Sequence, residues 1–142
     1  MKFTVQDLKR IAAAVRSGRA GDSRRLSTLL HRKEPHFCQI IDEVGMDPRC
    51  AGAHWFCLKF CALALKHAEG VAGRRLPKYP RYAIREVACL IAQGQPRVGK
   101  RACGYPERIR RHVLADGVFD EDDTAWLCTT ISTFLFLVER SF

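Results

Sequence analysis

Residues 53–69, AHWFCLKFCALALKHAE, decide the fold that we expect of this chain of 142 residues. If the segment is wound as a helix, apolar side chains surround almost all of it, and Lys59 and Lys66 form only a narrow polar strip. A helix that is apolar on nearly every side is stable only where other helices cover it. The segment therefore predicts a helix in the middle of a bundle.

The sequence on either side of this segment predicts further helices and no sheet. Apolar residues recur at helical spacing in six other stretches, at about 4–17, 22–32, 35–44, 80–93, 106–115 and 120–138. The last stretch contains β-branched residues, but no second segment offers a strand with which it could pair. We therefore expect an all-α fold over residues 1–142, a single compact bundle of six to seven helices with the largely apolar fourth and last helices at its centre.

Glycine and proline residues mark the expected helix ends. Gly70 follows the central segment, in the position where glycine often ends a helix. Pro106 precedes the sixth segment, where the missing N–H of a first-turn proline costs nothing. The pattern predicts that the central helix ends near Gly70 and that the sixth helix begins at Pro106.

The net charge of +9 is distributed unevenly along the chain. Residues 71–112 carry eleven basic and two acidic side chains, whereas residues 113–142 carry one basic and six acidic side chains. Such segregation produces a field of one sign over part of the surface and favours an anionic partner. The alternative is that the acidic segment folds back over the basic one.

Arginine and tyrosine residues alternate in the basic segment, which suggests a surface for phosphates and bases. Arginine binds phosphate with two parallel hydrogen bonds, and tyrosine rings stack on unpaired bases. The candidate binding residues are Arg74, Arg75, Lys78, Tyr79, Arg81, Tyr82, Arg85, Lys100, Arg101, Tyr105, Arg108, Arg110 and Arg111. We therefore expect a non-catalytic binding module whose basic face engages nucleic acid or an acidic protein.

A second basic stretch suggests a helix-turn-helix as an alternative. Only about four residues, 18–21, separate the first two expected helices, and the second carries Arg24, Arg25, Arg32 and Lys33. This spacing suits a recognition helix that enters the major groove of DNA. It suits an ordinary helical hairpin equally well.

Residues 49–56, RCAGAHWF, provide an alternative of a different class. Arg49 and His54 have the R-x4-H spacing, with an aromatic residue two positions after the histidine, and this resembles the signature of HEPN-type ribonucleases, which are small all-α domains. The resemblance implies that His54 acts in acid–base chemistry and that Arg49 steadies phosphate charge, with the two residues meeting across a dimer. The alternative to the ribonuclease is a structural role, in which His54 is a packed residue near the start of a helix.

The seven cysteines of the chain raise the question of a metal site. Cys50, His54, Cys57 and Cys61 are the candidate ligands, since zinc prefers four cysteine or histidine ligands. The last three follow one face of the central helix, but the ends of that trio lie too far apart to share an ion easily. We therefore expect these cysteines to be free thiols that pack in the core, with no metal and no cofactor.

Three further features of the sequence bear on its function: the absence of familiar catalytic motifs, the absence of export or membrane-spanning segments, and an apolar stretch in the last helix. The chain has no P-loop, no GxGxxG and no GxSxG motif, so we do not expect an enzyme built on a familiar motif. The first ten residues contain no uninterrupted apolar stretch, and no run is long enough to span a membrane, which predicts a cytoplasmic protein with no membrane partner. The apolar residues 134–138, FLFLV, suggest a homodimer interface on the last helix, which leaves a structural or adaptor homodimer with incidental basic charge as a further alternative.

Overall fold

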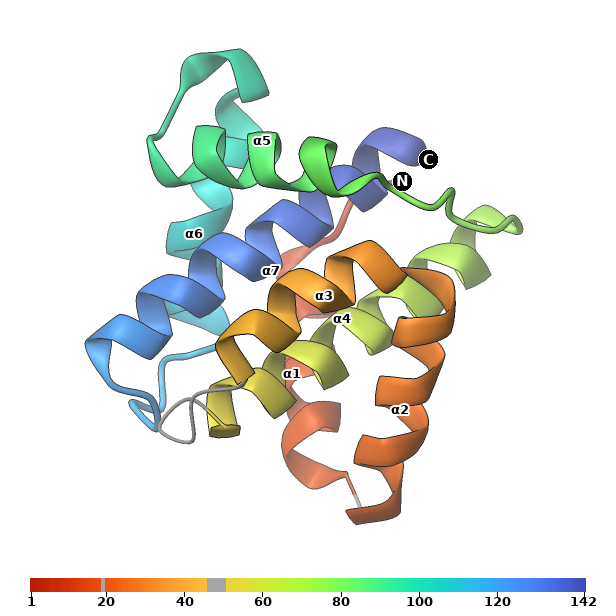
Figure 1. The fold of residues 1–142 in the computed structure, drawn as a ribbon. Helices are drawn as coiled ribbons and strands as arrows, with labels where there is room; N and C mark the ends of the chain where they lie inside the picture. The colour runs from red at the N-terminus through yellow and green to blue at the C-terminus, as the bar shows by residue number, and fades with distance from the viewer. Residues whose placement is uncertain (19, 46–50) are drawn as a thin grey trace.

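Seven α-helices and one 3₁₀ turn form the described part of the chain, with no strand (Figure 1). A computed structural model describes residues 1–18, 20–45 and 51–142. In chain order the elements are α1 (Val5–Ser17), α2 (Ala20–Lys33), α3 (Pro35–Gly45), α4 (Ala51–Ala72), α5 (Arg81–Ala92), the 3₁₀ turn η2 (Pro96–Val98), α6 (Lys100–His112) and α7 (Glu121–Ser141). The predicted all-α bundle is confirmed.

Helix α4 is one centre of the bundle, as its sequence predicts. It packs against α1, α2, α3 and α7. From Phe56 to Leu65 every residue is buried except Lys59 and Leu63. The polar strip seen in the sequence is therefore the one side of this stretch of α4 that no other described helix covers.

Helix α7 is the second centre, and it packs against α4, α5 and α6. Its residues Phe134, Leu135, Leu137 and Val138 are buried, and Phe136 is partly buried. The apolar surplus that suggested a homodimer is therefore covered within the chain. Dimerisation stays a prediction, although most of the apolar residues that motivated it are buried against other helices of the same chain.

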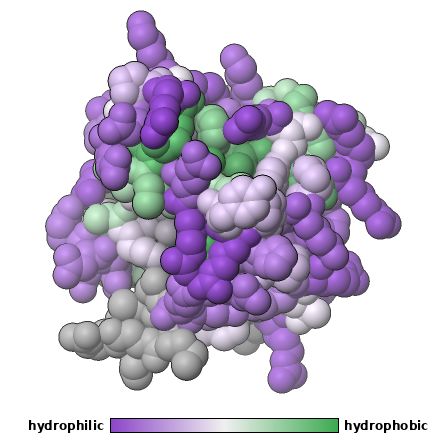
Figure 2. Space-filling view, turned by 45° about the horizontal axis from the view of Figure 1, so that its top comes forward, coloured by the Kyte–Doolittle hydropathy of each residue, from purple (hydrophilic) through white to green (hydrophobic). Residues whose placement is uncertain are grey.

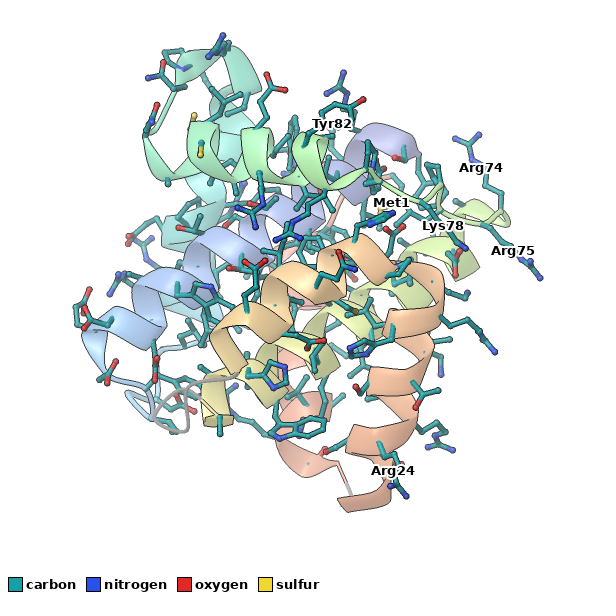
Figure 3. All side chains as sticks on the ribbon, in the orientation of Figure 1. Met1, Arg24, Arg74, Arg75, Lys78 and Tyr82 are labelled. Atoms are coloured by element: carbon teal, nitrogen blue, oxygen red, sulfur yellow. The ribbon has the colours of Figure 1, made fainter. Side chains whose placement is uncertain are left out.

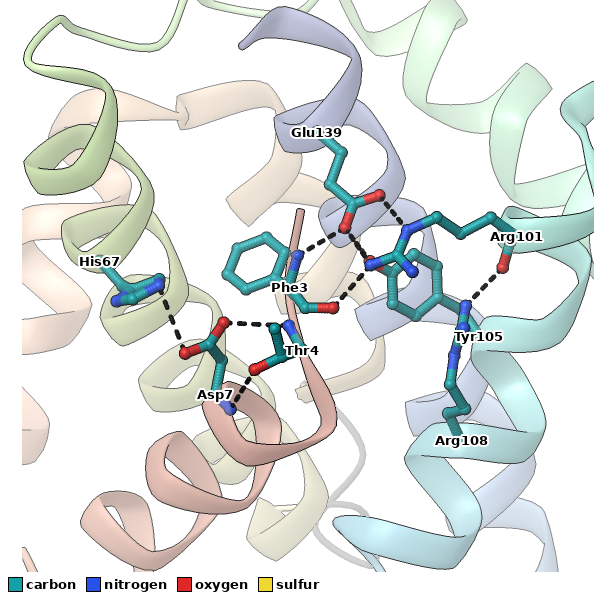
Figure 4. Close-up of polar contacts among 8 residues, drawn as sticks. All are labelled: Phe3, Thr4, Asp7, His67, Arg101, Tyr105, Arg108 and Glu139. Carbon is teal, nitrogen blue, oxygen red and sulfur yellow. Dashed lines mark hydrogen bonds and ion pairs between the residues drawn. The ribbon is translucent and has the colours of Figure 1, made fainter. Parts of the chain in front are cut away.

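The N-terminal segment closes the bundle next to its C-terminus (Figure 1). Thr4 caps α1, because its hydroxyl accepts a hydrogen bond from the backbone N–H of Asp7, and the Asp7 carboxylate accepts one from the N–H of Thr4 (Figure 4). The backbone N–H of Phe3 donates to Glu139 of α7 over 2.7 Å. The two ends of the chain are thus fastened to each other by side-chain contacts.

Two of the expected helix ends differ from the structure. Helix α4 continues through Gly70 to Ala72, and Gly73 follows it with a left-handed φ of 67°. Helix α6 begins at Lys100, so Pro106 lies inside it and not at its start. Burial explains the second difference, because Ala102, Tyr105 and Ile109 form one buried row along α6 that spans the proline.

None of the helices in the residues that the structure describes combines the length and the apolar character needed to cross a bilayer.

Candidate functional site

Arg101 and Tyr105, both in the predicted anion-binding set, hold the fold together (Figure 4). Arg101 donates to the two carboxylate oxygens of Glu139 over 2.8 and 3.0 Å, and to the carbonyl of Phe3 over 2.6 Å. The ring of Tyr105 is fully buried, and its hydroxyl donates to the same carboxylate. The hydrogen bonds from Arg101 and Tyr105 outweigh burial and lower the pKa of Glu139.

Arg108 belongs to the same cluster. Its guanidinium lies 4.4 Å from the centre of the Tyr105 ring and donates to the carbonyl of Arg101 over 2.6 Å. Arg101, Tyr105 and Arg108 therefore contact one another, and Arg101 also binds Phe3 and Glu139, while the buried Nε of Arg108 has no hydrogen-bond partner among the described residues. Tyr105 in particular is not accessible for stacking on a base.

Other cations of the predicted set lie in ion pairs on the surface. The pairs are those of Arg81 and Arg85 with Glu43, Arg110 with Glu121, and Arg111 with Glu107. Together with Arg101 and Glu139, the Arg110 pair brings two of the six carboxylates of residues 113–142 to arginines of residues 71–112, so the acidic segment neutralises only part of the basic one. Exposed pairs of this kind are weak, but they reduce the field available to a partner.

The remaining members of the predicted set lie in the segment before α5, in the first turn of α5 and at the start of α6. Arg74 donates to the carbonyl of Ser141, and Tyr79 donates its hydroxyl to the carbonyl of Leu137. Arg75, Lys78 and Lys100 are exposed and form no ion pair with the described residues, and Tyr82 is 74 % exposed. In Figure 3, Arg74, Arg75 and Lys78 extend outwards together before α5.

Tyr79 and Tyr82 line a depression of about 620 Å³ between α5 and the end of α7. We call it the α5–α7 depression. Arg97 and Arg140 contribute its cations, and Glu86 contributes a carboxylate. Figure 2 shows a face of the molecule on which hydrophilic side chains surround small apolar patches. The structure thus brings two of the predicted tyrosines together with two arginines that lie outside the predicted set.

A larger depression, of about 790 Å³, lies between α1 and α2 and has α4 as its floor. Both helices pack against α4 and only slightly against each other, so a groove remains between them. We call it the α1–α2 groove. Its lining residues are Ala14, Val15, Gly18, Asp22, Arg24, Arg25, Leu26, Thr28, Leu29, Arg32, Lys33, Lys59, Leu63 and Lys66.

The cations of this groove come from two places in the sequence. Arg24, Arg25, Arg32 and Lys33, which the helix-turn-helix hypothesis placed on a recognition helix, form its α2 wall. The polar strip of α4 supplies Lys59 and Lys66, and Leu63 lies between them. The sequence shows this strip as two lysines on an otherwise apolar helix. It does not show that the strip lies next to α2.

Most of the positive charge in the groove is not neutralised. Arg25 pairs with Asp22 over 2.7 Å, and Lys33 pairs with Glu69. The ammonium group of Lys59 reaches the carbonyl of Val15 at 3.4 Å.

Arg24, Arg32 and Lys66 form no ion pair with the described residues. Together with Lys59, they leave four cations that no carboxylate balances. Among the described lining residues Asp22 is the one carboxylate, and Arg25 already occupies it. The groove therefore offers charge and apolar surface to a partner at the same place.

His54, the candidate acid–base residue, belongs to a different cluster. Its Nε2 lies 2.8 Å from Oδ1 of Asp42, while Nε2 of His31 lies 2.8 Å from Oδ2 of the same carboxylate. This cluster joins α2, α3 and α4. Arg49, the other half of the ribonuclease pair, lies outside the described residues.

The cysteines of α4 do not form a metal site with their described neighbours. Cys57 and Cys61 are completely buried, and burial raises the pKa of Cys61, which keeps it a thiol. His54 points to Asp42. No group of three or more His, Cys, Asp or Glu residues in the described part of the chain is arranged to hold a metal ion, and Cys50 lies outside that part.

Comparison of the chain with protein-family models finds no match, and comparisons with curated proteins and with solved structures find none either. Any assignment of function therefore depends on the surface chemistry described above.

Proposed function

We propose that this chain is a non-catalytic binding module that engages an anionic partner through the α1–α2 groove. The proposal keeps the class of function expected from the sequence and moves the site from the Arg/Tyr-rich segment to the groove. The observation that carries it is the group of four cations, Arg24, Arg32, Lys59 and Lys66, around one depression without a carboxylate to balance them.

The α5–α7 depression supports this function less well. It offers the two cations Arg97 and Arg140 against the carboxylate of Glu86, so its net charge is small. Charge of one sign gathered in a concave surface concentrates the field and attracts an opposite charge from a distance. The α1–α2 groove meets this condition better than the surface predicted from the sequence.

The experiment is binding to a labelled polyanion, such as polyglutamate, at about 0.05 M and about 0.3 M NaCl, since salt screens exposed charges. We expect binding that weakens with salt. The double variant Arg24→Gln/Arg32→Gln should bind about fivefold to tenfold more weakly at the lower salt, as expected for the loss of two exposed charge contacts.

The matched control is Arg97→Gln/Arg140→Gln, which removes the same charge from the α5–α7 depression and should change the affinity much less. If both double variants lose the same affinity for the polyanion, net charge alone explains the effect. The groove is then not the binding site. Absence of polyanion binding by the unmodified protein would end the proposal.

A further inference from the structure

We infer that the α1–α2 groove receives an acidic amphipathic helix of a partner protein, with carboxylates on both sides of an apolar centre. This inference rests on the proposed function and names the partner class for that same groove. It is carried by the order of side chains along α2 and α4, two of the three helices that border the groove.

The side chains that line the groove follow the same order on α4 and on α2, with an apolar residue between charged ones. On α4 the row is Lys59, Leu63 and Lys66, with spacings of four and three residues. Such spacings place all three side chains on one side of a helix. Leu63 is half-buried, so the centre of the row is an accessible apolar contact.

The row on α2 has Leu29 at its centre. Arg25, which pairs with Asp22, precedes this leucine by four residues, and Arg32 follows it by three; Arg24, five residues before the leucine, also lines the groove. Leu29 is also half-buried, while Arg24 and Arg32 are exposed. Each row therefore has an apolar centre with cations at both ends.

A partner that matches these rows needs negative charge at two places, about 10 Å apart, on either side of an apolar patch, given a rise of about 1.5 Å per residue over the seven residues from Lys59 to Lys66. A helix with carboxylates about two turns apart and leucine-like residues between them meets this requirement. A fatty acid or another amphiphile with a single charged head would leave one end of each row unsatisfied.

Nucleic acid fits the groove less well than a helix does. Binding of single strands depends on aromatic rings that stack on bases, and none of the described lining residues is aromatic. Leu29 and Leu63 would gain little from a phosphate backbone. The apolar centre is what a protein helix uses and a sugar–phosphate chain does not.

The experiment uses two labelled peptides of about fourteen residues, which as helices are about 21 Å long. One places leucines in a central stripe with glutamates one turn to either side. The other has the same composition, with the leucines distributed around the helix. We expect the full chain to bind the first peptide about tenfold more tightly than the second in a fluorescence anisotropy titration.

Two variants test the apolar centre separately from the charge. Leu63→Gln and Leu29→Gln should each reduce the preference for the striped peptide to about twofold or less, because the leucines of that peptide lose their apolar contact in the groove. The control is Leu90→Gln, at a half-buried leucine of the α5–α7 depression, which should leave the preference intact. Helical content measured by circular dichroism establishes that each variant is folded.

Failure of this inference can be told from failure of the proposed function. If polyglutamate binds but both peptides bind equally, or if Leu63→Gln and Leu29→Gln keep the preference, the groove binds anions and the helical partner is wrong. If an oligouridylate displaces the striped peptide and binds more tightly, the partner is nucleic acid and the inference is overturned. If none of these anions binds, the proposed function fails as well.

Discussion

The guanidinium of Arg101 on α6 donates to both carboxylate oxygens of Glu139 on α7, over 2.8 and 3.0 Å. The same carboxylate accepts hydrogen bonds from Tyr105 and from the backbone of Phe3. Its oxygens thus connect the N-terminus, α6 and α7. An arginine that looked like a phosphate-binding residue in the sequence is therefore part of the framework of the bundle.

We predict that Glu139→Gln lowers the free energy of unfolding by about 2–3 kcal/mol, since it removes the charge of a carboxylate that is only 11 % exposed and that accepts hydrogen bonds from Arg101, Tyr105 and Phe3. Urea unfolding followed by circular dichroism measures the change. The control is Glu121→Gln, which removes only the exposed pair with Arg110 and should cost less than about 1 kcal/mol. If the two variants lose the same stability, the Arg101 cluster contributes no more than a surface ion pair.

Glu34 is predicted to make stability fall as pH rises. It is only 1 % exposed, one of its carboxylate oxygens has no hydrogen-bond partner, and burial raises its pKa from 4.5 to about 7. Because the folded chain holds the proton more tightly than the unfolded chain, this group costs stability progressively between pH 4.5 and 7.

Glu34→Gln should therefore stabilise the protein at pH 8 by about 2–3 kcal/mol and have little effect near pH 4, since the amide mimics the protonated acid. Denaturant unfolding at the two pH values measures both effects. A loss of stability at pH 8 would show that the Glu34 carboxylate is stabilising where it lies.

The cluster of His31, Asp42 and His54 is predicted to stabilise the fold in the mildly acidic range. Hydrogen bonds from the two histidines outweigh burial and lower the pKa of Asp42 from 3.8, so its contribution is lost as pH falls through the folded value. The hydrogen bond to Asp42 outweighs desolvation and raises the pKa of His31 from 6.5, so that contribution is lost as pH rises through the folded value.

We predict that Asp42→Asn costs the most stability between about pH 4 and pH 6.5, where the carboxylate is charged and the imidazole of His31 is protonated. Thermal unfolding across this range provides the measurement. His36→Gln, at an exposed histidine outside the cluster, is the control. A cost that is the same at every pH would show that Asp42 acts only as a neutral hydrogen-bond acceptor.

The centre of the fold could be predicted because it depends on local pattern. Residues 53–69 are apolar nearly all around, and burial of that segment follows from its sequence alone. The start of α6 could not be predicted in the same way. Pro106 looked like a helix start, whereas the helix passes through it because Tyr105 must reach Glu139 on a distant part of the chain.

We predict that Pro106→Ala raises the free energy of unfolding by about 1–2 kcal/mol, because it restores a helical hydrogen bond. The greater freedom of alanine in the unfolded chain offsets part of this stabilisation. The melting temperature should rise by about 3–8 °C. Arg111→Ala, in the last turn of the same helix, is the control and should change it little. A fall in the melting temperature would mean that the proline ring itself packs favourably against its neighbours.

The candidate site was less accessible to prediction because it depends on contacts between distant segments. Arg24 and Arg32 lie on α2, and Lys59 and Lys66 lie about 35 residues further along the chain. Each group is an ordinary solvated face when taken alone. They become one groove only because α1 and α2 both pack on α4 and leave a space between them.

The thiols provide a last prediction, which tests the packing of the two central helices. Among the described cysteines Cys89 is exposed and Cys103 is half-buried, whereas Cys38, Cys57, Cys61 and Cys128 are buried. Burial raises the pKa of Cys38, Cys61 and Cys128, which lowers the thiolate fraction that reacts with an alkylating reagent.

Iodoacetamide applied to the native protein should therefore label Cys89 first and Cys103 more slowly, while the four buried thiols react only after unfolding in urea. Peptide mapping by mass spectrometry identifies the labelled positions. Labelling of Cys57 or Cys61 at the rate of Cys89 would mean that the side of α4 that carries them opens to solvent. Since that side carries the core contacts of α4, its opening would contradict the central position of the helix on which the α1–α2 groove depends.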